Sequence, residues 1–254
     1  MSTLNIDPIG HHEFSIGTVL SQTFSTFIGS FPSFAIAGLV IYAPFFVYYF
    51  FFAAAPEPSM LDDEDFTALF MDAAGGNSVE KIATFFMDVL LDAVVTLGAI
   101  QYCRGMPIPL SASAKIGIER IGVILGASIL VNIAFILGLV LLIVPGIIAA
   151  LALMAAIPVI VAEDTTAFTA LDRSNNLTKG HRMAILGGGC VILLVVIIVF
   201  VGLGLLPDFL YDMIATFLLP LVTVITSCFS AATYVNLVAA KEGADSASIA
   251  AVFE

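Results

Sequence analysis

The sequence predicts an all-α polytopic membrane protein with six transmembrane helices and several amphipathic helices at the membrane surface. Hydrophobic residues make up 60% of the 254 residues and charged residues only 11%, whereas soluble globular domains have roughly 45–50% and about 25%. The mean hydropathy is +1.11. Several uncharged apolar runs reach the roughly 20 residues that cross the hydrocarbon core. We therefore expect one membrane domain from residue 14 to residue 240.

The N-terminal part is predicted to hold two spans, residues 31–55 and 82–103. Residues 1–13 form a cytoplasmic tail without the features of a signal peptide, and residues 14–30 resemble an interfacial helix. Between the two spans, residues 56–78 carry six acidic residues and no Lys or Arg. We expect a solvated acidic loop there, which accounts for much of the net charge of -12.

The middle of the chain is predicted to form a tight helical hairpin. Residues 121–162 contain no charged residue and are too long for one helix. Pro145 and Gly146 supply a break, so spans 121–144 and 146–162 should cross with almost no loop between them. The last predicted spans and the tail are residues 184–206, 213–240 and 241–254, with a short acidic turn at 207–212.

A polar stretch, residues 162–185, separates the fourth and fifth spans and reads as an amphipathic surface helix. Asp164 or Thr165 is expected to cap its start and Gly180 to close its end. One predicted face holds Phe168, Leu171, Ser174 and Leu177, and the other holds Asp172, Arg173, Asn176 and Lys179. Segments 15–29, 111–122 and 166–180 each precede a span, which is compatible with three repeats of interfacial helix and hairpin. The sequence similarity among the three segments is weak, so the sequence alone does not decide whether they are repeats.

Basic residues predict the orientation, because short cytoplasmic loops carry an excess of Lys and Arg. With a cytoplasmic N-terminus, only Lys81 lies outside. The other seven, Arg104, Lys115, Arg120, Arg173, Lys179, Arg182 and Lys241, lie inside. We expect a multi-pass protein of the cytoplasmic (inner) membrane of a prokaryote, with both termini cytoplasmic and the acidic loop extracytoplasmic.

Residues 143–183 resemble the YciC-like membrane proteins and the membrane domain fused to some bacterial glycerophosphoryl diester phosphodiesterases. The matching residues are Pro145, Gly146, Glu163, Arg173, Ser174, Leu177, Thr178, Lys179 and Gly180. Met183 replaces the family's aromatic residue after the Lys-Gly pair. The resemblance in span order covers most of residues 14–240 and implies a helical membrane domain. It does not imply hydrolysis, because the chain lacks the His-Arg-Gly start and the acidic metal ligands of the catalytic barrel.

Two carboxylates, Asp88 and Asp92, stand four residues apart inside the predicted span 82–103 and so share one helical face. Acidic side chains within a span are costly and usually face a cavity, a partner or a proton path. They could bind a proton or a cation there. The interpretation that we favour from the sequence is that they lie in the outer half of the span, near the acidic loop, and simply reach water.

Basic residues at the inner membrane surface form the second candidate site. Arg173, Lys179, His181 and Arg182 could attract the headgroups of anionic lipids at the cytoplasmic leaflet. The alternative is that these charges set the topology and form local ion pairs. Asn132, Gln101 and Asn236, within or at the ends of spans, are expected to form hydrogen bonds between helices.

The sequence shows no catalytic constellation, and its three scattered cysteines fit neither a disulfide framework nor a metal site. We expect no cofactor and no nucleic-acid partner. The leading interpretation is a non-enzymatic membrane module that binds lipids, a membrane protein or a second copy of itself. The alternative is a small proton- or cation-coupled transporter or channel, and a third, weaker interpretation is a membrane-embedded lipid enzyme.

Overall fold

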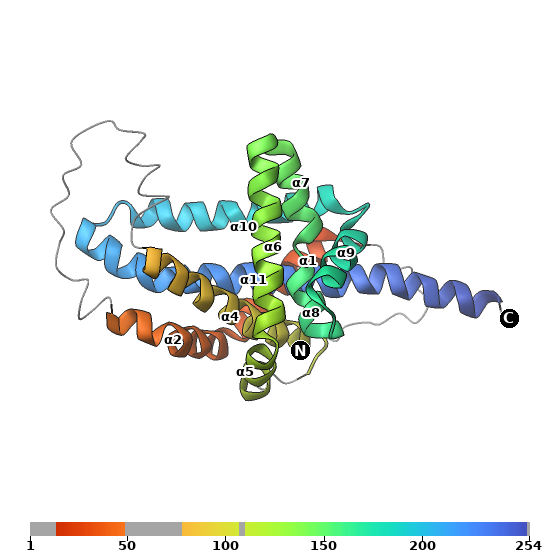
Figure 1. The fold of residues 1–254 in the computed structure, drawn as a ribbon, viewed down its shortest axis with the longest axis horizontal. Helices are drawn as coiled ribbons and strands as arrows, with labels where there is room; N and C mark the ends of the chain where they lie inside the picture. The colour runs from red at the N-terminus through yellow and green to blue at the C-terminus, as the bar shows by residue number, and fades with distance from the viewer. Residues whose placement is uncertain (1–13, 49–77, 107–109, 253–254) are drawn as a thin grey trace.

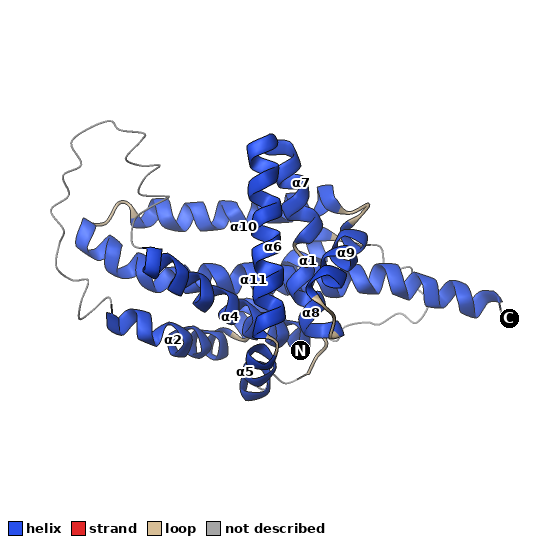
Figure 2. Cartoon of the chain, in the orientation of Figure 1, coloured by secondary structure: helices blue, strands red, loops and turns tan. Residues whose placement is uncertain are grey.

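The computed structural model describes residues 14–48, 78–106 and 110–252, and every regular element within these ranges is a helix (Figure 1, Figure 2). The predicted all-α class is confirmed. The helices are α1 (Ile16–Gly29), α2 (Phe31–Tyr48), α4 (Ser78–Cys103), α5 (Leu110–Glu119), α6 (Ile121–Leu141), α7 (Ile143–Leu153), α8 (Ala156–Glu163), α9 (Ala167–Thr178), α10 (Arg182–Leu203) and α11 (Asp208–Val252). The predicted tail 1–13, the end of the first span (49–55) and the acidic loop up to residue 77 lie outside the described residues.

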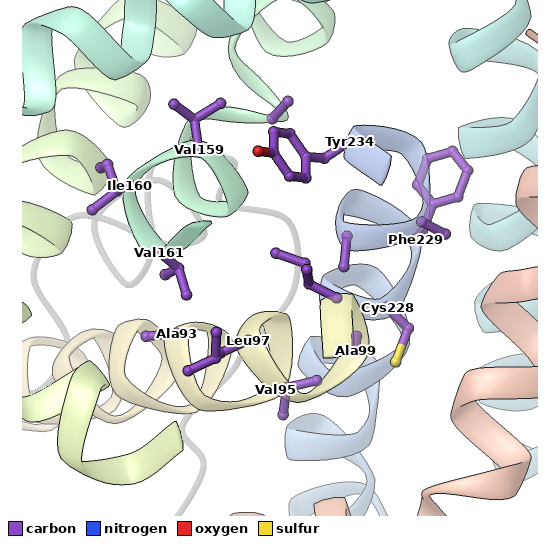
Figure 3. Packing of buried hydrophobic residues seen from close by; sticks show 14 of the residues in the cluster. Ala93, Val95, Leu97, Ala99, Val159, Ile160, Val161, Cys228, Phe229 and Tyr234 are labelled. Atoms are coloured by element: carbon purple, nitrogen blue, oxygen red, sulfur yellow. The ribbon is translucent and has the colours of Figure 1, made fainter. Parts of the chain in front are cut away.

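Helices α4 and α11 form the centre of the molecule. Their candidate spans are 50% and 56% buried, against 22% for α6 and 17% for α10. Small residues allow close packing here, among them Ala93 and Ala99 of α4 and Cys228 of α11, which Figure 3 shows in the same buried cluster as Val159, Ile160 and Val161 of α8. Since helices in lipid associate through close van der Waals contact, small side chains at the central interface stabilise it.

Five segments within the described residues are long and apolar enough to cross a membrane. A sixth results if α1 and α2, bent by 69° at Ser30, count as one broken span. Each of α1, α5 and α9 directly precedes a longer apolar helix, as the sequence predicts. Whether these pairs are repeats of one unit stays a prediction.

The predicted hairpin is present as α6 and α7, but its break lies at Leu142 and not at Pro145-Gly146. Leu142 is extended, with φ -169° and ψ 149°. Pro145 sits in the first turn of α7, where a missing N–H costs nothing because that position has no helical acceptor. A Cβ on Gly138 would lie 2.6 Å from the Cα of Gly146, so the glycine pair lets the two helices touch.

The fourth predicted span is also divided, since α7 ends at Leu153 and α8 begins at Ala156. In Figure 1, α6 and α7 run across the direction of α2, α4, α10 and α11. The candidate spans therefore do not share one axis as a simple bundle would.

Helix α9 occupies the predicted surface stretch, with corrections at its start. Thr166 is the N-cap, and its hydroxyl accepts the N–H of Thr169 at 3.4 Å. The predicted caps Asp164 and Thr165 are wrong, because Asp164 adopts a left-handed conformation (φ 53°) that ends α8. Gly180, with φ 93°, lies just after the end of α9 as expected.

The predicted apolar face of α9 is only partly right. Ser174 and Leu177 are buried, but Phe168 is 71% exposed. Arg173, which the pattern predicts on the solvated face, instead pairs with Glu163 and Glu242. Hydrogen bonds to α7 and α8, described below, decide which side of α9 faces inward.

Helix α11 is longer than predicted at both ends. The expected turn at 207–212 is already helical from Asp208, and the helix continues through the expected C-terminal tail to Val252. In Figure 1 its C-terminal end extends away from the other helices.

Candidate functional site

An open pocket of about 470 Å³ lies between α4, α6, the α7–α8 break and α11. Its polar lining consists of Asp88, Asp92, Ser128, Asn132, Thr223, Thr226, Ser227 and Ser230, and its apolar lining of Phe85, Val89, Val131, Leu153, Met154, Ile157 and Phe229. The pocket thus brings both predicted carboxylates together with side chains from distant parts of the sequence.

Two hydroxyl groups from other helices hold Asp88. Tyr42 of α2 donates a short hydrogen bond to Asp88 Oδ1, and Thr223 of α11 donates to the same oxygen at 2.9 Å. Tyr42 is itself 4% exposed and belongs to the core. A half-buried carboxylate is therefore fixed in place by two neutral donors.

The second carboxylate, Asp92, repeats this arrangement one turn further on. Ser227 of α11 donates to Asp92 Oδ1, and Thr96 of α4 donates to it at 3.1 Å. Thr223 and Ser227 have the same four-residue spacing as the two aspartates. Helices α4 and α11 therefore run parallel along this contact, which agrees with the predicted topology in which the second and sixth spans cross in the same direction.

The charge of the pocket is acidic and has no basic counterpart in its lining. Among the described residues that line it, none is Lys, Arg or His. The hydrogen bonds described for the two carboxylates all end on Oδ1, which leaves each Oδ2 outside this hydroxyl network. Carboxylates in apolar surroundings without a paired charge favour the approach of a proton or a cation.

The second candidate site, the basic residues Arg173, Lys179, His181 and Arg182 (the rim), is arranged differently, because Arg173 is already paired. Arg173 Nε lies 3.2 Å from Glu163 Oε2, and Arg173 also forms an ion pair with Glu242 of α11. Tyr234 donates to Glu163 at 2.9 Å. The bond to Glu242, together with the charges of both carboxylates, raises the pKa of Arg173. This residue thus ties α8, α9 and α11 together.

The other rim residues lie at the junction of α9, α10 and α11. Lys179 has an exposed side chain, while its backbone oxygen accepts Nζ of Lys241 at 3.0 Å. Arg182 donates to the side chain of Asn175. His181 packs 4.8 Å from the ring of Phe14, and its burial, together with the charge of Lys241, lowers its pKa.

Two of the residues that carry the resemblance, Ser174 and Thr178, stabilise the break between α7 and α8. Ser174 donates to the backbone oxygen of Ala152 at 2.8 Å and accepts the N–H of Ala155 at 3.1 Å. Thr178 donates to the same oxygen of Ala152 at 3.3 Å. Since unpaired buried backbone groups are costly, these side chains stabilise the broken helix.

Sequence reasoning missed the donors that hold the two aspartates. Tyr42 and the Thr223/Ser227 pair were not singled out, although hydroxyls four residues apart in an apolar span are a usable signal. The expectation for Asn132 was wrong, because it donates to Ser128 of its own helix at 2.9 Å. Asn236 does bond between helices, to Gln22 of α1 at 2.6 Å.

In the described part of the chain, no three His, Cys, Asp or Glu side chains gather as metal ligands would. No protein-family model, no curated protein and no solved structure matches the chain. The resemblance to the YciC-like proteins therefore stays a prediction, and the functional argument depends on the geometry of the pocket and the rim.

Proposed function

We propose that this membrane protein is a small, non-enzymatic transporter or channel whose pocket at Asp88 and Asp92 holds a proton or a cation. The observation that carries the proposal is the pair of carboxylates in one pocket with four hydroxyl donors and, in the described part of its lining, no basic residue. A structural ion pair would supply its own opposite charge. Here the opposite charge is left for a ligand.

Flux through reconstituted proteoliposomes tests this proposal. A cation gradient across wild-type vesicles should give proton or alkali-cation flux, and the double variant Asp88→Asn/Asp92→Asn should lose it. Asp172→Asn is the matched control, because Asp172 is an exposed carboxylate on α9. Equal flux in all three proteins would remove the two aspartates from the function.

The predicted lipid contact is a second candidate function, and one observation favours it. Phe168 at the start of α9 and Met183 at the start of α10 are 71% and 78% exposed, on the same segment as Lys179 and Arg182. Exposed apolar side chains next to cations suit the boundary between acyl chains and anionic headgroups. Arg173 is excluded from this role because both Glu163 and Glu242 already pair with it.

Native mass spectrometry of protein released from mild detergent tests the second candidate. Wild-type protein should retain an anionic phospholipid, and Lys179→Gln/Arg182→Gln should lose it. Retention of the same lipid by the variant would contradict the role of these cations. The same spectra report whether a second copy or a membrane protein partner stays bound.

For orientation, we propose the cytoplasmic membrane of a prokaryote with both termini cytoplasmic. The proposal is supported by the seven-to-one distribution of basic residues. A reporter protein active only in the cytoplasm, fused after Glu254, should be active. An inactive reporter on a well-expressed fusion would reverse the orientation.

A further inference from the structure

The size of the pocket at Asp88 and Asp92 exceeds what a proton or a metal ion needs. A single water occupies roughly 30 Å³ of liquid, and a dehydrated metal ion needs no more. The pocket volume of about 470 Å³ falls within the roughly 300–1,000 Å³ of pockets that hold small organic molecules. Its volume therefore suits an organic ligand.

The acidic side chains of the pocket determine which charge that ligand should carry. Asp88 and Asp92 lie on α4, and the hydroxyls of Thr223 and Ser227 hold them from α11. A neutral ligand would leave these carboxylates uncompensated, and an anion would be repelled. A positively charged group gains both Coulomb attraction and charge-assisted hydrogen bonds in such surroundings.

The apolar side chains of the pocket determine the character of the rest of the ligand. Phe85, Phe229, Val131 and Met154 all line the same pocket. A bare metal ion gains nothing from these side chains, because it needs several oxygen ligands close around it. An alkyl or aromatic body is stabilised by them, and the face of a Phe ring attracts a cation within about 6 Å. Methionine adapts to irregular ligands.

Two exposed residues connect the pocket to the outside. Asn132 of α6 and Thr226 of α11 belong to the lining, and both are exposed on the surface of the described structure. Helices α6 and α10 each expose several large apolar side chains. A molecule with an apolar body that partitions into the membrane can therefore reach the pocket from its side.

We propose that the pocket takes an organic ammonium ion with an apolar body, its nitrogen at Asp88 and Asp92 and its body against Phe85, Val131 and Phe229. This inference rests on the proposed function, because it names the class of cation that the same site would hold. Protons and alkali cations then act as competitors for the two carboxylates.

Isothermal titration of the full chain in nanodiscs of zwitterionic lipid tests the inference, with benzyltrimethylammonium as the probe and benzyl alcohol as its neutral comparison. One ammonium ion should bind per chain, and benzyl alcohol should bind far more weakly. Asp88→Asn/Asp92→Asn should lower the affinity by about tenfold or more, because the Coulomb attraction between the ammonium ion and the two carboxylates is lost. Asp172→Asn should leave the affinity unchanged.

A variant that fills the apolar part separates this inference from the proposed function. Val131→Phe should weaken ammonium binding while leaving proton or alkali-cation flux dependent on the two aspartates. If benzyltrimethylammonium does not bind but wild-type flux still requires Asp88 and Asp92, the organic ligand is wrong and the proposed function stands. If neither flux nor binding depends on the aspartates, both are wrong.

Discussion

The pocket and the rim both place acidic side chains among the packed helices, but they balance the charge in opposite ways. At the rim, Glu163 and Glu242 both pair with Arg173. In the pocket, the partners of Asp88 and Asp92 among the described residues are hydroxyl groups, which donate hydrogen bonds to the two carboxylates. Charges that are paired inside the protein hold helices together, whereas charges without a counterpart are available to a ligand.

The largest expected effect comes from breaking the rim at its shared base. Arg173→Met leaves two carboxylates unpaired and should lower the free energy of unfolding by about 2 kcal/mol, less than the roughly 3–5 kcal/mol for a fully buried pair because the rim is partly exposed. Lys115→Met is the control, since its pair with Glu119 is exposed. Thermal unfolding in detergent micelles measures both. Equal losses would mean that the rim pairs are as weak as ordinary surface pairs.

A pair of tyrosine variants compares the two regions directly. Tyr234→Phe removes the donor to Glu163, and Tyr42→Phe removes the donor to Asp88. Each should cost about 1 kcal/mol of stability, the usual worth of such a bond. The change at Tyr42 should also alter cation binding by the pocket, while the change at Tyr234 should not. Titration of each variant with benzyltrimethylammonium checks this, and equal binding changes would contradict the separation of roles.

Removing one charge from the pocket should not lower the free energy of unfolding, in contrast to the change at Arg173. Asp92→Asn keeps an acceptor for Ser227 and Thr96 but removes an uncompensated charge from a partly apolar site. We expect stability without ligand to be unchanged or to rise by up to about 1 kcal/mol, as when a functional residue is replaced. Unfolding midpoints at fixed detergent concentration test it. A loss as large as that of Arg173→Met would show that the charge is structural.

The smallest expected effect concerns His181 and pH. Because burial lowers its pKa in the folded protein, the unfolded chain takes up this proton more readily. Stability from this group is complete above the unfolded pKa of about 6.5 and declines as the pH falls below it. The unfolding midpoint of wild-type protein should therefore fall more than that of His181→Gln between pH 7.5 and 5.5. Parallel profiles would show that His181 contributes nothing.

Much of the helical layout could be predicted from the sequence, because a span needs only a sufficient run of apolar residues. The breaks could not. Leu142 ends α6 because the chain there turns to bring Gly138 against Gly146, and the break before α8 depends on hydrogen bonds from Ser174. These causes are tertiary contacts that periodicity does not contain.

The candidate site could be predicted only in its charged half. Asp88 and Asp92 stand out in the sequence because charges are rare in apolar spans. Their donors Tyr42 and Thr223 lie 46 and 135 residues away from Asp88, so only the packing of α2 and α11 on α4 identifies them. On α9, polar contacts to Ala152 turned Arg173 inward and left Phe168 exposed, against the simple apolar pattern.

Labelling of the pocket carboxylates tests the central claim most directly. An apolar carbodiimide modifies protonated carboxyl groups in apolar sites, and mass spectrometry of peptides identifies the labelled residue. We predict that Asp88 or Asp92 is labelled in the ligand-free protein and that Na⁺ or benzyltrimethylammonium suppresses the label in proportion to its occupancy. If both carboxyls are labelled and no added cation changes the labelling at any concentration, the result contradicts a cation site in this pocket.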